Sequence, residues 1–355
     1  LRSLMEAFAE NIAKGLKEKQ LAHGVVNCYA SPRRLAVQID RLQLQAPDKA
    51  IETWGPPEKV AFDDDGSPTR AAQAFMKKNA ITVDQLELRD SPKGKRLYHC
   101  AQNPGVCAAS IMPAIVIEAL EKLPIPKRMH WGDQRELFVR PVHWVVLLLG
   151  EQLLPATILG IESATLSRGH RFHHPDFLTI PRPSDYAPLL YQKGRVMADF
   201  DERRERIKQQ VETCAQTLGE GVRAVVDESL LDEVTALVEW PVALSGRFDQ
   251  RFLDVPAEAL MSSMTGHQKY FPVVNAKGDL LPNFIFVSNL ESTDPEQVIS
   301  GNERVIRPRL ADAAFFFETD KKQSLDSRLG KLVAIVFQSK LGSVGDKSRR
   351  VAKLS

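Results

Sequence analysis

Residues 264–273 read MTGHQKYFPV and gather side chains that could do chemistry. His267 could act as a general base, Lys269 could hold an anion, and Gln268 could donate and accept hydrogen bonds. An active site, a binding surface and the polar start of a strand all fit this composition. For Gln268 and Lys269 two roles stay open, contact with a partner molecule and local hydrogen bonding.

The same stretch predicts a strand that begins near residue 267. The run Phe-Pro-Val at 271–273 is apolar, as in a buried strand. Side chains alternate between the two faces of a strand. We therefore expect Tyr270 and Phe271 on opposite faces, with Phe271 in the core.

Three histidines could form a metal site. His170, His173 and His174 have the i, i+3, i+4 spacing that would place them on one face of a helix, where they could hold zinc. Gly169 and Pro175 instead favour a loop. The favoured interpretation is a structural or ligand-facing loop, and we assign no metal ligand.

A glycine-rich stretch at 342–348, GSVGDKS, resembles a phosphate-binding loop. That motif requires four residues between its glycines and a lysine directly after the second. Here two residues separate the glycines and Asp346 precedes the lysine. We interpret the stretch as a connection between helices. Nucleophile-elbow, zinc-protease and dinucleotide-binding motifs are absent from the sequence, so no catalytic residue is assigned.

Clusters of basic residues offer phosphate-binding chemistry. The net charge is only +2, so binding of a polyanion must depend on local clusters. The run at 304–309 is the strongest, because its arginines could brace phosphates while the phenylalanines at 315–317 anchor the helix in the core. Interior pairing with Glu303 or Asp312 is the open alternative. The candidate binding or interface residues are Arg33, Arg34, Lys127, Arg128, Arg168, Arg171, Gln268, Lys269, Arg304, Arg307 and Arg309.

The elements that must position these residues are helices mixed with strands. A four-residue apolar repeat predicts a helix over 3–19, and alternating acids make 203–206 a solvated helix face. Gly-Pro-Pro at 55–57 is expected to interrupt regular structure. Further helices are predicted over 69–79, 108–122, 227–239 and 303–327. Strands are predicted over 25–30, 34–39, 142–149, 153–160, 241–245, 270–274 and 283–289.

This mixture predicts an α+β fold with several domains and mainly antiparallel sheets. We divide the chain into 1–165, 166–325 and 326–355. No apolar run approaches the roughly 18 residues of a membrane helix. The four cysteines are scattered without a C-x-x-C pair, which favours a reducing compartment. The chain starts at Leu1 and stops inside a helical pattern, so we expect both ends to be cut.

Several stretches together resemble the β subunit of bacterial glycyl-tRNA synthetase. They follow one another in the order of that family and cover essentially the whole chain. The departures are small, with His130 where many members have Arg and His267 where Asp is also found. The stretches are ASPRRLAV at 30–37, LPIPKRMHWG at 123–132, FVRPVHW at 138–144, TILGI at 157–161, RGHRF at 168–172, LVEWP at 237–241, HQKYFP at 267–272, LPNFIFV at 281–287, ISGNERV at 299–305 and RPRLADA at 307–313.

The resemblance implies one half of an α2β2 enzyme of the cytoplasm that joins glycine to tRNA(Gly) using ATP and Mg²⁺. In that family the adenylate-forming site lies on the α subunit, so this chain would hold no cofactor. Its partners would be the α subunit and tRNA(Gly), with neither DNA nor a membrane. The implied parts are a B3/B4-like region at 166–325 and the start of a helical HD-type domain at 326–355. The family's first strand and C-terminal anticodon-binding domain would be missing.

Two alternatives to tRNA binding remain open. One is an editing-type hydrolase with a pocket near His267 or the histidines at 170–174. Glycine is the smallest amino acid, so size exclusion at the synthetic site makes editing the weaker alternative. The other is a scaffold for the α dimer with little RNA contact.

Overall fold

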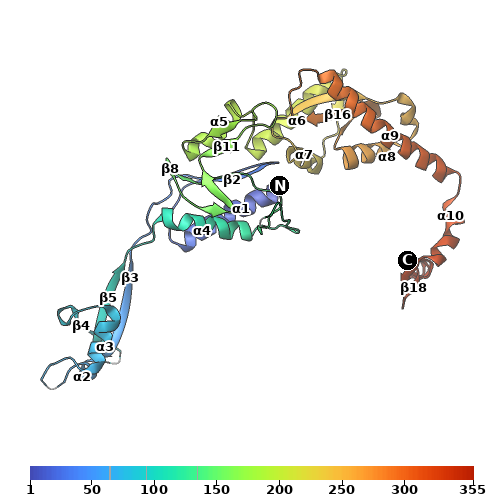
Figure 1. Cartoon of the computed structure of the whole chain (residues 1–355). Helices are drawn as coiled ribbons and strands as arrows, with labels where there is room; N and C mark the ends of the chain where they lie inside the picture. The colour runs from blue at the N-terminus through green and yellow to red at the C-terminus, as the bar shows by residue number, and fades with distance from the viewer. Residues whose placement is uncertain (64, 93, 134) are drawn as a thin grey trace.

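The chain is an α+β protein of mixed helices and mainly antiparallel sheets. The structure is a computed structural model that describes residues 1–63, 65–92, 94–133 and 135–355. Figure 1 shows a slender arm at one end, two adjoining bodies, and a C-terminal segment that extends beyond the long helix α9. Among the described strands, only β6 and β10 pair in parallel.

The first body packs α1 (Arg2–Glu18) and α4 (Ala108–Glu121) against the hairpin of β1 (Val26–Ser31) and β2 (Arg34–Ile39). The predicted helices and strands are confirmed here. The four-residue repeat works because it places one apolar side chain on the same face of α1 at every turn. The buried residues of that face are Met5, Phe8, Ile12 and Leu16.

The arm contains a three-stranded sheet that the sequence did not predict. Its elements are β3 (Lys49–Pro57), α2 (Glu58–Ala61), α3 (Arg70–Asn79), η1 (Val83–Gln85), β4 (Glu87–Ser91) and β5 (Gly94–Asn103). The expected interruption at 55–57 is wrong, because β3 continues to Pro57 through an irregular register opposite β5. The ring of Trp54 lies edge-on to that of Tyr98, with centroids 5.0 Å apart. Phe75, Leu97 and two alanines form the small core cluster of the arm, and Tyr98 is buried as well.

Short strands connect the two bodies. The strands predicted over 142–149 and 153–160 form only in pieces: residue 147 separates β6 from β7, and residues 154–156 separate β8 from β9. The pieces are β6 (Val145–Val146), β7 (Leu148–Leu149), β8 (Gln152–Leu153), β9 (Thr157–Ile158) and β10 (Ile161–Ala164). After them come β11 (Leu166–Arg168), β12 (Phe177–Thr179), η2 (Pro183–Asp185) and α5 (Tyr186–Gln192).

The second body is a four-stranded sheet, ordered β13-β15-β16-β14, with helices on both faces. Phe271 packs with Ile207 and Leu231 on one face, and Tyr270 packs with Ile306 and others on the opposite one. The predicted alternation and the core position of Phe271 are confirmed. The strands are β13 (Arg223–Ala224), β14 (Val242–Arg247), β15 (Phe271–Val274) and β16 (Leu280–Ser288). The helices are α6 (Phe200–Gln216), α7 (Glu228–Thr235), η3 (Gln250–Asp254), α8 (Ala257–Ser263), η4 (Met264–Gln268) and α9 (Pro295–Lys321).

The C-terminal segment is not purely helical. Its elements are α10 (Leu325–Arg328), η5 (Leu329–Ala334), β17 (Val336–Gln338), β18 (Gly342–Ser343) and α11 (Val344–Leu354). The stretch 342–348 therefore joins a strand to a helix, so its interpretation as a helix–helix connection is wrong. Ser343 and Asp346 cap α11 reciprocally, which satisfies amide groups at the helix start. Within the described parts of the chain, no helix is long and apolar enough to cross a membrane.

Candidate nucleic-acid interface

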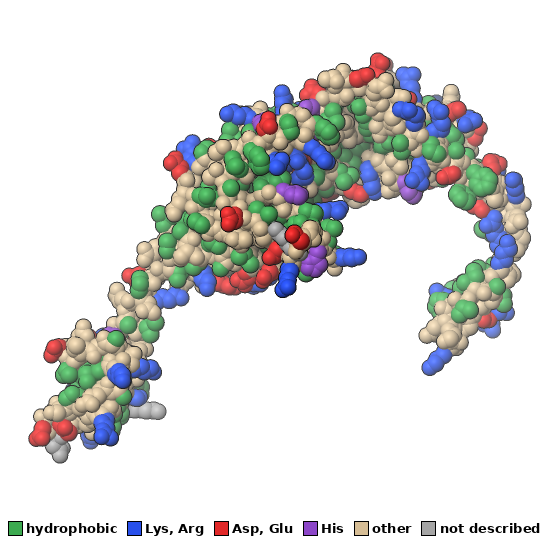
Figure 2. All heavy atoms as spheres, in the orientation of Figure 1, with side chains coloured by type: hydrophobic (Ala, Val, Ile, Leu, Met, Phe, Trp, Pro, Cys, Tyr) green, Lys and Arg blue, Asp and Glu red, His purple; other side chains and the backbone are tan. Residues whose placement is uncertain are grey.

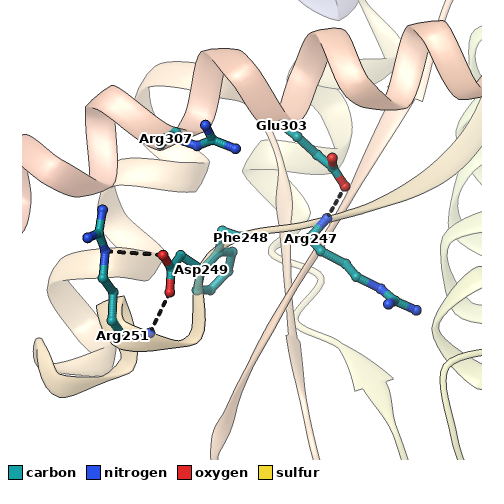
Figure 3. A pocket seen from close by; sticks show the side chains of 6 residues that line it. All are labelled: Arg247, Phe248, Asp249, Arg251, Glu303 and Arg307. Carbon is teal, nitrogen blue, oxygen red and sulfur yellow. Dashed lines mark hydrogen bonds and ion pairs between the residues drawn. The ribbon is translucent and has the colours of Figure 1, made fainter.

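An open hollow of about 360 Å³ lies between η3 and α9. We call it the arginine pocket. Figure 3 shows Arg251 reaching from η3 toward α9 and Arg307 on the side of α9 that faces η3, while the side chain of Arg247 points away from the hollow and from Glu303. Arg251 and Arg307 are the guanidiniums that face the hollow, and Asp249 and Glu303 supply its two carboxylates. Its lining residues are Arg247, Phe248, Asp249, Arg251, Glu303 and Arg307.

The loop side of the pocket is fixed by local hydrogen bonds and by core packing. The ring of Phe248 packs against the core, and its amide donates to the Pro282 carbonyl at 3.1 Å. The Asp249 carboxylate then caps η3 by accepting the Arg251 amide at 3.1 Å. The second Asp249 oxygen pairs with Arg251 Nε at 3.2 Å. Asp249 therefore orients the Arg251 guanidinium, and the other nitrogens of that group stay available to a ligand.

The helix side of the pocket is fixed by two buried residues of α9. Ile306 and Leu310 are fully buried against the sheet, which fixes the rotation of the helix. Arg307 projects beside them into the pocket. Glu303, one turn earlier, accepts the Arg247 amide at 2.8 Å, tying α9 to the end of β14.

The other residues of the 304–317 run lie differently from the prediction. Arg304, Arg307 and Arg309 are all exposed. Interior pairing with Glu303 or Asp312 is therefore wrong. Only Arg307 of the three lines the arginine pocket.

The aromatic anchor expected at 315–317 is only partly present. Phe317 packs against the core, whereas Phe315 and Phe316 are exposed and contact each other edge-on. A helix that packs on one face cannot bury three consecutive side chains, because each residue turns by about 100°.

The arginine pocket can hold phosphate groups. A guanidinium donates two parallel hydrogen bonds to one phosphate, and arginine stays charged at any physiological pH. Figure 2 shows lysine and arginine side chains mixed with acidic ones over the body that contains α9, not one continuous basic face. Binding of a polyanion would therefore depend on a few oriented guanidiniums.

Arg33 and Arg34 have an internal role. Both pair with Glu239, which follows Arg33 by 206 residues and Arg34 by 205 in the sequence. Glu239 is 1 % exposed. Arg33 also donates to the Gly169 carbonyl at 2.7 Å, and Arg34 donates to the Arg168 carbonyl. The side chain of Arg34 is only 2 % exposed. We call this group of five residues the Glu239 hub, and it joins the β1–β2 hairpin to the second body.

The remaining predicted residues lie apart from the arginine pocket. Arg128 donates to the Leu120 and Glu121 carbonyls at 3.3 and 2.6 Å, so it caps the end of α4. Lys127 beside it is exposed. Arg168 and Arg171 belong to the β11–β12 hairpin, and the Arg168 guanidinium lies 4.2 Å from the Phe177 ring.

The stretch around His267 is not the start of a strand. Met264–Gln268 forms a wide helical turn, Lys269 follows with a left-handed φ of 60°, and β15 begins only at Phe271. Lys269 Nζ donates to the Gly266 carbonyl and pairs with Glu233, both at 2.9 Å. The bond to Gly266 closes the turn. The alternation of apolar residues in the sequence predicts a strand and gives no sign of this turn. His267 is exposed and Gln268 half-buried.

The three histidines lie in a loop, as the flanking glycine and proline predicted. His170 Nε2 contacts the Asn289 carbonyl at 2.6 Å, and its Nδ1 accepts the amides of Phe172 and His173. His173 Nε2 accepts the Glu291 amide at 3.0 Å. Those ring nitrogens are already engaged. Among the described residues, no cluster has the composition of a metal site.

Sequence reasoning missed Arg203, which is fully buried although it was predicted on a solvated face. Its guanidinium donates to the Ala30 carbonyl at 2.7 Å and the Thr235 carbonyl at 3.2 Å, as well as to carbonyls at 197–199. Burial lowers the pKa of Arg203 to about 10. The acids that alternate with it in sequence point elsewhere, so the local charge pattern concealed it.

Stability is expected to fall as the pH falls below neutrality. Burial lowers the pKa of His170, while Asn289 works against this shift. Below the ordinary histidine pKa of about 6.5 the unfolded chain takes up a proton that the folded chain resists. We expect the free energy of unfolding to decrease between pH 7.5 and 5.5 for this reason.

Urea unfolding at both pH values measures that drop. His170→Gln should reduce the pH dependence, whereas His267→Gln, at an exposed histidine, should not. Equal pH dependence in the two variants would disprove the role of His170.

At lower pH a second loss of stability begins, this time at Glu239. Burial works to raise the pKa of Glu239, but Arg34 and Arg33 outweigh it and hold it below the ordinary value. The contribution of Glu239 is therefore lost as the pH falls through its folded pKa.

The fold is that of an α+β protein, and its open pocket is lined by arginines together with two carboxylates. Comparison with known proteins gives the family. The family described as glycyl-tRNA synthetase beta subunit matches residues 1–355, and the chain belongs to it.

Similar proteins include glycine–tRNA ligase beta subunits from three bacteria. That of Marinobacter nauticus is 53% identical over 355 residues, that of Hahella chejuensis 52% over 356, and that of Edwardsiella ictaluri 49% over 355. Each alignment covers 100% of this chain and 51% of the relative. The chain thus spans about half the length of these relatives.

Proposed function

We propose that this chain is the part of a glycine–tRNA ligase beta subunit that binds tRNA(Gly) and positions it for glycylation. Family membership supports the subunit, since relatives of about 50% identity have that name. The arginine pocket supports the RNA contact, because Arg251 and Arg307 present guanidiniums in an open hollow. That pocket is the observation on which the proposal rests.

The chemistry of glycylation is assigned to the partner in this proposal. ATP and Mg²⁺ act in the whole enzyme at an adenylate-forming site on the α subunit, within an α2β2 assembly of the cytoplasm. The chain itself contributes phosphate contacts that hold tRNA in register. DNA and membranes have no part in this function. The B3/B4-like region at 166–325 and the HD-type start at 326–355 belong to the same proposal.

Binding of the chain to tRNA(Gly) at several salt concentrations tests this function, with a non-cognate tRNA as control. Phosphate contacts release counterions, so the affinity is expected to fall steeply with salt. No binding at low salt would refute tRNA binding by this chain and favour a scaffold for the α dimer. Hydrolysis of mischarged tRNA by the chain, abolished by His267→Ala, would instead favour the editing-type hydrolase.

A further inference from the structure

The loop between β11 and β12, residues 169–176, is held in place from several sides. His170 is fully buried, and its Nδ1 accepts the Phe172 and His173 amides at 3.3 and 3.2 Å. The His174 amide donates to the His170 carbonyl at 2.9 Å. From outside the loop, the Glu291 amide donates to His173 Nε2 at 3.0 Å.

The base of the loop is fixed as well. Arg33 and Arg34 of the Glu239 hub donate to the Gly169 carbonyl. A Cβ at Gly169 would lie 2.5 Å from the His174 carbonyl oxygen, so the loop closes on itself too tightly for any larger residue there. The loop backbone is therefore preorganised.

This rigid loop presents aromatic rings to solvent. Phe172 at its tip is 68 % exposed, and Phe177 at its end is 50 % exposed. Burying a phenylalanine stabilises a protein by about 2 kcal/mol, a gain that both residues forgo in large part. Single exposed apolar residues are common, but here two aromatic rings share one hairpin.

Positive charge accompanies the rings. Arg171 precedes Phe172 and is exposed. The Arg168 guanidinium lies over the Phe177 ring, 4.2 Å from its centroid. The acidic residues nearby are Asp176 in the loop and Glu291 beside His173, both exposed. The hairpin thus combines flat apolar faces with cations.

We propose that this hairpin, Arg168–Phe177, is a stacking platform for unpaired nucleotides of an RNA. An unpaired base has a flat face that stacks on an aromatic ring or a guanidinium, and its phosphate is neutralised by a neighbouring arginine. A base within a duplex is already stacked on both sides and gains nothing. The inference extends the proposed tRNA binding, since it names the part of the RNA that this surface takes.

Fluorescence anisotropy with a 12-nucleotide single-stranded RNA tests the platform, with the matching RNA duplex for comparison. The chain is expected to bind the single strand more tightly than the duplex. Phe172→Ala should weaken single-strand binding about tenfold and leave duplex binding unchanged. Phe172→Trp should retain the affinity, because the larger ring still stacks. Phe315→Ala is the matched control, since that residue is 65 % exposed on α9.

The results that would overturn the stacking platform differ from those that would overturn tRNA binding by the chain. Absence of single-strand binding, or equal affinity of the wild type and Phe172→Ala, would overturn the platform. If tRNA(Gly) still binds with steep salt dependence in that case, the proposed function stands and only the platform falls. A urea melt of Phe172→Ala should match the wild type, because the loop bonds involve the backbone amide of residue 172 and not its ring.

Discussion

Replacing Glu239 with alanine is expected to lower the free energy of unfolding by about 3–5 kcal/mol. The carboxylate is the only side-chain anion within the Glu239 hub, where it receives the Arg34 guanidinium, two nitrogens of Arg33 and the Ser31 hydroxyl. Without it, the buried positive charge of Arg34 has no counter-charge, and removing one partner of a buried pair is far more costly than removing an exposed one.

Urea unfolding at pH 7.5 measures this loss. Asp232→Ala is the matched control, because it removes the ion pairs of an exposed carboxylate to Arg204 at 2.6 Å and to Arg2 at 3.4 Å. That change should cost about 1 kcal/mol or less. Glu239→Gln should fall between the two, since the amide keeps the shape but neutralises the charge. If Glu239→Ala were no more damaging than Asp232→Ala, the hub would not hold the two bodies together.

The double variant Arg251→Ala/Arg307→Ala is expected to lower tRNA(Gly) affinity by about tenfold or more at 0.15 M salt. The slope of log affinity against log salt should also decrease by about 2, because each lost phosphate contact removes about one released counterion. Folding should survive, since both side chains are exposed. The affinity measured over a salt series reports both quantities.

Arg304→Ala/Arg309→Ala provides a charge-matched control for that prediction. It removes the same formal charge from exposed positions, and both residues lie on α9 outside the pocket lining. A general field effect would weaken binding equally in the two double variants. Equal losses would therefore contradict a specific role for the arginine pocket, and no loss in either would contradict RNA binding through α9.

The helices were predictable where one face of each is buried. α1 and α4 have apolar residues at the spacing that helix geometry and a neighbouring core require. The arm strands β3 and β5 escaped prediction. Their side chains are largely exposed, so apolar alternation is weak. Their pairing depends on each other and not on local pattern.

The candidate site was predictable only in part. Clusters of arginine were visible in sequence, but the fate of each guanidinium depended on a distant partner. Arg34 donates to Glu239, and Arg203 donates to carbonyls of β1 and α7. These partners are too far apart in the sequence for a local pattern to predict the pairing. Arg307 and Arg251 line the same pocket only because η3 lies against α9. Sequence identified the residue type, and tertiary contacts decided which guanidiniums stayed free.

Arginine footprinting with phenylglyoxal, with and without tRNA(Gly) and with mass spectrometry as the readout, tests the central claim most directly. The arginine pocket predicts that tRNA protects Arg251 and Arg307 from modification, while Arg309 on the same helix remains as reactive as in the free chain. Arg34 should be unreactive in both states because it is buried. Equal reactivity of Arg251 and Arg307 with and without bound tRNA would contradict the proposed interface.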